Sequence, residues 1–144
     1  MSIKTWSTQT PRVLYKRLEP GESLVRCLES LADSEGIREA VITSCIGSLK
    51  QLSLRNLCDR KEEVPEFERH TLIENLELVS AEGYIQPLEE GGTRVHVHVA
   101  AARPSGEMVG GHCEDAICFT GAFMYVQILE ECQNNLTTSH VPIK

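Results

Sequence analysis

The segment from Arg94 to His112, RVHVHVAAARPSGEMVGGH, constrains the fold most, because His96 and His98 alternate in it with valines. Successive side chains of a β-strand point to opposite faces of the sheet. The two imidazoles therefore share one face and the valines the other, which predicts a strand with one apolar side. The Cα atoms of two such histidines lie roughly 6.5–7 Å apart, a distance that two imidazoles can span to share one metal ion.

A third ligand is needed for such an ion, and His112 is the candidate. It follows Pro104-Ser105-Gly106, which indicates a tight turn, and the flexible pair Gly110-Gly111. We expect the chain to fold back there and bring His112 beside the first two histidines. The alternative is a solvated strand face on which the histidines bind nothing, because the motif lacks the fixed spacing of zinc-finger patterns.

The length of 144 residues indicates one domain. A hydrophobic content of 41% and a charged content of 24% are typical of a globular protein. No apolar run approaches the roughly 20 residues that cross a bilayer, and the first residues, MSIKTWSTQTPR, lack the apolar core of a signal peptide. We therefore expect a cytoplasmic protein without a membrane segment.

The six cysteines never form a Cys-x-x-Cys motif, and with no secretion signal they are expected to be buried thiols. Cys113 adjoins His112 and could add a thiolate ligand, but strand alternation would point it to the opposite face. The six are Cys27, Cys45, Cys58, Cys113, Cys118 and Cys132.

The formal net charge is −7 and the isoelectric point about 5.2, which argues against a protein that binds nucleic acid by itself. Neutralising phosphates requires a basic surface. The nearest approach to one is Arg12, Lys16 and Arg17, a cluster too small to carry DNA affinity. Direct nucleic-acid binding is therefore not expected.

Apolar periodicity predicts one helix, over residues 22–34, with Glu22 in its first turn and Gly36 as its stop signal. Strands are predicted over 13–18, 39–46, 49–54, 76–85, 94–99 and 116–129, with Gly47 as a bulge or bend. Residues 56–70 are charged and contain Pro65, which predicts a loop that includes a solvated His70. The result is an α+β domain, residues 13–130, built on a largely antiparallel sheet with one main helix and flanked by tails at 1–12 and 131–144.

Several motifs in this order resemble the PPC domain, the domain conserved in plants and prokaryotes. They are Leu18-x-x-Gly21-Glu22, Ile46-Gly47-Ser48, Glu77-Leu78-Val79-Ser80 with Gly83, His96-x-His98, and Gly106 followed by Gly110-Gly111-His112. The resemblance covers about Val13 to Leu129, and the combination of His-x-His with Gly-Gly-His is its most specific part.

The resemblance implies a compact domain that forms a homotrimer and holds zinc, or another divalent metal, through His96, His98 and His112. In plant relatives the domain contacts protein partners while an AT-hook supplies the DNA affinity. This chain has no Arg-Gly-Arg-Pro core, so a DNA-associated role would depend on partners. The interpretation that follows is a metal-binding module with a regulatory role.

A more distant similarity to acetolactate decarboxylase, whose zinc is bound by His-x-His and a later histidine, implies the alternative of a zinc-dependent, lyase-like enzyme. Its substrate would be a small carbonyl or carboxylate compound. Such an enzyme needs an acid or base and a group that holds a carboxylate. The charged residues nearest in sequence, Glu82, Arg103, Glu114 and Asp115, are expected to be ordinary surface charges, so the catalytic residues stay unknown.

Overall fold

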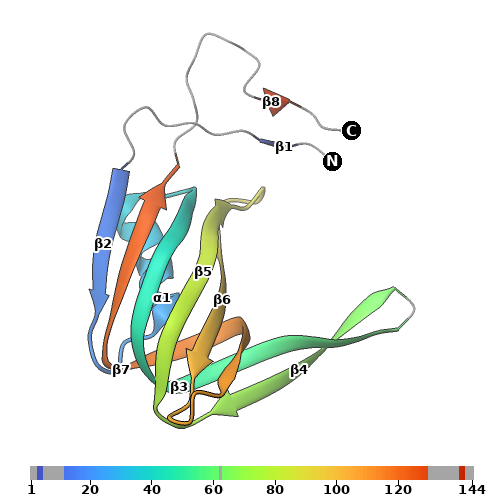
Figure 1. Ribbon diagram of the computed structural model, residues 1–144. Helices are drawn as coiled ribbons and strands as arrows, with labels where there is room; N and C mark the ends of the chain where they lie inside the picture. The colour runs from blue at the N-terminus through green and yellow to red at the C-terminus, as the bar shows by residue number, and fades with distance from the viewer. Residues whose placement is uncertain (1–2, 5–11, 62, 130–139, 142–144) are drawn as a thin grey trace.

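The computed structural model describes residues 3–4, 12–61, 63–129 and 140–141. Their secondary structure is mostly antiparallel β-sheet with one helix, as predicted (Figure 1). The strands are β1 (Ile3–Lys4), β2 (Arg12–Leu18), β3 (Ala40–Lys61), β4 (Val64–Leu72), β5 (Leu76–Pro87), β6 (Thr93–Ala102), β7 (Met108–Ile128) and β8 (His140–Val141); the helix is α1 (Leu24–Glu35).

Helix α1 begins two residues later than predicted. The Ser23 side chain caps it by accepting a hydrogen bond from the backbone N–H of Arg26, so Glu22 lies before the first turn and the predicted acidic first turn is wrong. Gly36 ends the helix in the left-handed conformation, as its position predicted. The buried side chains Leu24 and Leu28 hold the helix against the sheet.

Two long strands organise the sheet. Its order is β2-β7-β6-β5-β3-β4, and β7 pairs with β3 in addition, so the pairings β3–β5–β6–β7–β3 form a closed ring. The close approach of β3 and β7 at Gly47 requires glycine, because a Cβ there would collide with the carbonyl oxygen of Gly121 and with Ala122. The ladder register shifts just after this position, in agreement with the predicted bulge.

The core consists of alternate strand residues together with the apolar face of α1. Along β6, Val97 and Val99 are buried, while His96 and His98, which alternate with them, face outward as predicted. Met124 and Val126 of β7 are buried in the same core.

The predicted loop at 56–70 is wrong. Residues to Lys61 continue β3, and β4 returns beside it, so the two form a hairpin arm that projects from the rest of the sheet (Figure 1). Its side chains are largely exposed, and the alternation that signals a half-buried strand is therefore missing from the sequence. His70 lies on this arm, exposed, with its Nε2 3.4 Å from Glu68.

Two residues from each predicted tail, Ile3–Lys4 and His140–Val141, pair as β1 and β8, and Arg12 already belongs to β2. The rest of both predicted tails, 1–2, 5–11, 131–139 and 142–144, lies outside the described residues. Across the described ranges, α1 is too short and too polar to cross a bilayer, and no other helix is present.

Candidate metal centre

Two neighbouring strands carry the three predicted ligands. His96 and His98 lie on β6, and His112 lies on β7 directly opposite His98 in the antiparallel ladder. Residues paired in this way place their side chains on the same face of the sheet. The hairpin formed by β6 and β7 therefore brings all three imidazoles together, as the glycine-rich turn predicted.

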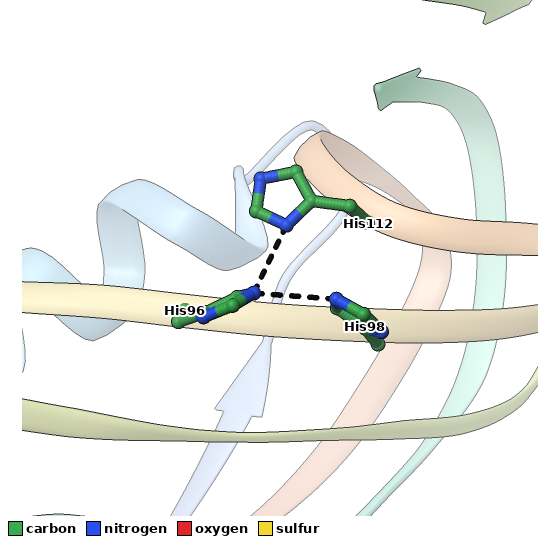
Figure 2. Close-up of side chains that lie close together, drawn as sticks. All are labelled: His96, His98 and His112. Carbon is green, nitrogen blue, oxygen red and sulfur yellow. Dashed lines mark hydrogen bonds between the residues drawn. The ribbon is translucent and has the colours of Figure 1, made fainter. Parts of the chain in front are cut away.

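The ring nitrogens converge at one point (Figure 2). His96 Nε2 lies 3.2 Å from His98 Nε2 and 3.1 Å from His112 Nδ1. The ligand atoms of all three residues lie within 4.8 Å of one another. His96 and His112 are half-buried and His98 is exposed, so the cluster is open to solvent on one side.

Two of these separations, those from His96 Nε2 to the other two histidines, fit a zinc ion. Zinc binds imidazole nitrogen at about 2.0–2.1 Å with tetrahedral geometry, so two nitrogens that share one ion lie about 3.3 Å apart. The separations of 3.1 and 3.2 Å agree with that value. Three imidazole ligands would fill three corners of the tetrahedron and leave the fourth open, which is the pattern of ligand-binding and catalytic sites.

The hydroxyl of Tyr84 contacts the central imidazole. Its oxygen lies 2.8 Å from His96 Nδ1, on the far side of the ring from the other histidines. A neutral imidazole carries one N–H and one lone pair. When the Nδ1–H is donated to Tyr84, the lone pair stays on Nε2, which faces His98 and His112.

Burial and neighbouring positive charges favour the neutral form of His96 and His112. Burial, followed by the charge of the neighbouring His98, lowers the pKa of His96. Burial and the two other histidines likewise lower the pKa of His112. A neutral imidazole is the form that binds a metal, so the local charges favour metal binding around pH 7.

Asn56, which lies on β3 within the wrongly predicted loop, positions the backbone of His112. Its Nδ2 donates to the carbonyl of Gly110 at 3.0 Å, and its Oδ1 accepts the N–H of His112 at 3.1 Å. A Cβ on Gly111 would overlap this amide group, and the φ of +137° at Gly111 is strained for any other residue. The Gly-Gly pair before His112 therefore makes room for Asn56.

Cys113 points away from the cluster, as the alternation predicted. Its side chain is buried, and burial, followed by the charge of Asp115, raises its pKa to about 12. The five described cysteines are free thiols. Cys45 and Cys118 are also buried and Cys27 is half-buried, but Cys58 is exposed, so the prediction of burial is wrong for that residue; Cys132 lies outside the described residues.

Most of the charged residues named from the sequence are bound to other side chains. Arg103 contacts Glu74 at 2.7 Å and Glu107 at 3.0 Å, and Asp115 accepts a hydrogen bond from Ser23 near the start of α1. Glu114 binds Arg69 of β4 at 2.9 Å. Glu82 differs, because it lies on β5 directly opposite His98 in the ladder and so shares the histidine face of the sheet.

An open depression of about 600 Å³ adjoins the histidines. Besides the imidazoles, its walls include Arg55 and Phe67 from the β3–β4 arm and Arg94 from β6. Sequence reasoning missed all three. Arg94 could have been found, since it lies two residues before His96 on the same strand face, but nothing in the local sequence marks Arg55 or Phe67.

Comparison with known proteins identifies a family match over most of the chain. The profile described as the Plants and Prokaryotes Conserved (PCC) domain matches residues 7–130. Two solved structures are similar over nearly the full length of both chains. The metal-containing protein of Archaeoglobus fulgidus is 25% identical, with 100% of each chain covered and a TM-score of 0.76. The plant- and prokaryote-conserved protein of Pyrococcus horikoshii is 26% identical, with 95% of each chain covered and a TM-score of 0.73.

A Staphylococcus aureus protein described as similar to α-acetolactate decarboxylase shares the fold at a TM-score of 0.56, with 15% identity, 82% of this chain and 53% of that chain covered. Among curated proteins, the bifunctional protein GlmU of a Synechococcus strain (JA-3-3Ab) is 35% identical over 105 residues, or 73% of this chain. The chain spans only 15% of the length of that relative.

Proposed function

This chain belongs to the Plants and Prokaryotes Conserved (PCC) domain family, and from that membership we propose that it is a homotrimeric metal-binding module. One divalent cation, zinc, would be held by His96, His98 and His112. The module would act in regulation through a protein partner or a small molecule, and any association with DNA would be made through such partners. The net charge of −7 supports this last point, and we expect negligible affinity for duplex DNA at physiological salt.

The convergence of three imidazole nitrogens at 3.1 and 3.2 Å is the observation that carries the proposal. Nitrogen ligands favour zinc and neighbouring transition metals over magnesium and calcium, which prefer oxygen. Tyr84 and Asn56 also support a metal site, since each holds one histidine in the orientation that binding requires.

An exposed aromatic patch supports the trimer. We define it as Tyr15 of β2, Ile46 of β3, and Phe123 and Tyr125 of β7. The ring of Tyr15 lies 5.3 Å from that of Tyr125 and 6.4 Å from that of Phe123, and Ile46 pairs with Phe123 in the ladder. The four side chains are 41–55% exposed. A contiguous apolar patch of this kind is typical of a surface that a second subunit covers.

A second candidate is a metal-dependent enzyme that acts on a small carbonyl or carboxylate compound. The open fourth position and the adjoining depression favour it, because a substrate could reach the histidine cluster from solvent. Zinc held by three neutral imidazoles supplies a Lewis acid for a carbonyl oxygen. Of the chain's own residues, Glu82 is the carboxylate placed beside His98, where it could hold or release a proton.

Elemental analysis of the purified protein, prepared without chelators, tests the metal proposal. We expect close to one divalent ion per chain in the wild type and less than a tenth of that in His96→Ala. The control is His70→Ala, which alters an exposed histidine outside the cluster and should keep the metal. A wild type without metal, or a His96→Ala variant that retains it, would contradict the three-histidine site.

Light scattering and an activity assay test the remaining parts. The mass in solution should be three times that of one chain, and a monomer would refute the trimer. Release of carbon dioxide from small keto acids that disappears in His96→Ala would favour the enzyme over the module.

A further inference from the structure

Arg55 differs from Arg12, Arg69 and Arg103 in what its guanidinium group contacts. Arg12, Arg69 and Arg103 each lie within 3.0 Å of a carboxylate oxygen. The guanidinium carbon of Arg55 instead lies 4.0 Å from the centre of the Phe67 ring. Its Nε is buried and has no hydrogen-bond partner in the part of the chain that the structure describes. A buried donor without a partner is unusual in a folded protein and requires an explanation, of which an absent ligand is one.

The position of Arg55 places its side chain beside the three histidines. Leu54 pairs with Cys113 in the β3–β7 ladder, so the next residue of β3 lies beside His112. Arg55, His96, His98 and His112 all line the same depression. The ring of Phe67 supports the flat guanidinium group by a cation–π contact and limits its movement.

The charge of the depression is positive on balance. Arg94 lies on its wall, on the same strand face as His96 and His98. Glu114 is already bound to Arg69 at 2.9 Å, which leaves Glu82, opposite His98, as the nearby carboxylate that the ladder places on this face. A divalent cation would add to the positive charge, and an anion in the depression would balance it.

We propose that the depression binds a small molecule carrying an oxyanion group, a carboxylate or a phosphate, with Arg55 holding that group next to the three histidines. This inference rests on the proposed function, because the rest of the ligand would lie at the open position of the metal centre. The planar fork of a guanidinium group matches the paired oxygens of a carboxylate or phosphate. The guanidinium group of Arg55, held in place by the Phe67 ring, would therefore select ligands that carry such an anionic group.

Isothermal titration of the metal-loaded protein with inorganic phosphate and, separately, with pyruvate tests the inference. Arg55→Met keeps an apolar stem over Phe67 and removes the charge, and we expect it to bind at least tenfold more weakly than the wild type. Arg12→Met is the matched control, since it makes the same charge change at an ion pair with Glu35 and should bind as the wild type does. Arg55→Lys keeps the charge without the planar guanidinium group, and its affinity should lie between those of Arg55→Met and the wild type. It replaces Arg55→Met in the test if that variant fails to fold.

The two probes distinguish the possible anionic groups. Tighter binding of phosphate identifies phosphorylated ligands, and tighter binding of pyruvate identifies carboxylates. Binding of neither probe by the wild type, or equal binding by Arg55→Met, overturns the inference. Elemental analysis of the same samples separates this from the proposed function: a metal-free wild type refutes the metal module, whereas metal-loaded protein that ignores both probes refutes only the role of Arg55.

Discussion

The histidine cluster and the aromatic patch lie near opposite ends of strand β7, and the two regions are built differently. The cluster is polar and is held by hydrogen bonds from other strands, those of Tyr84 to His96 and of Asn56 to the backbone of His112. The patch consists of three aromatic rings that contact one another and of Ile46, with about half of their surface exposed to solvent.

This difference indicates two kinds of partner. Converging lone pairs held by hydrogen bonds suit a small cation, whose binding requires fixed geometry. Exposed apolar side chains suit another apolar surface, because burying apolar area is favourable in many relative orientations. Strand β7 thus contributes to both a candidate binding site and a candidate subunit interface. Substitutions in one region should leave the function of the other unchanged.

The largest expected effect is the loss of the trimer in Tyr125→Asp. A charge in the middle of a covered apolar patch would be buried without a partner, which strongly disfavours association. We expect the mass in light scattering to fall to that of one chain, while elemental analysis still finds the metal.

The matched control is Ile73→Asp, which places the same charge on an apolar side chain that is 79% exposed and outside the patch. It should remain a trimer. A Tyr125→Asp protein that stays trimeric would remove the patch from the interface, and one that also loses its metal would show that the two regions depend on each other.

A smaller effect concerns the thiol beside the cluster. Burial raises the pKa of the Cys113 thiol to about 12, so the thiol stays protonated near neutral pH and reacts slowly. We therefore expect iodoacetamide to alkylate Cys113 at least a hundredfold more slowly than exposed Cys58. Peptide mass spectrometry of the folded protein measures both rates. Rapid modification of Cys113 in the folded protein would place its sulfur on the histidine side of β7.

The smallest effect is expected for Tyr84→Phe, which removes the hydrogen bond to His96 Nδ1 and keeps the ring. Partners of this kind raise metal affinity about 10- to 100-fold, and we expect a zinc Kd about tenfold weaker in competition with a chromophoric chelator. Tyr15→Phe, a change of the same size in the aromatic patch, should leave the Kd unchanged. Equal affinities for Tyr84→Phe and the wild type would mean that Tyr84 does not orient His96.

The sequence allowed the convergence of the three histidines to be predicted because the signals for it are local. Alternation places His96 and His98 on one strand face, and the glycines before His112 allow the chain to return beside them. The helix was also predictable, because its apolar residues recur every three to four positions and Gly36 follows.

The missed features depend on contacts between distant strands. Strand β4 could not be predicted from the sequence, because its side chains are mostly exposed and no apolar alternation marks it. Asn56 and Arg55 sit on the other strand of that arm, far in sequence from the histidines that they approach. Their roles follow from the pairing of β3 with β7, which no local pattern encodes.

The central claim is that three histidines hold one metal ion. Anomalous diffraction from crystals of the native protein, grown without chelators, tests it most directly, because it locates the metal and identifies it by its absorption edge. The account predicts one zinc peak per chain, about 2.0–2.1 Å from His96 Nε2, His98 Nε2 and His112 Nδ1. Well-ordered imidazoles with no peak between them, or a peak bound by other residues, would contradict it.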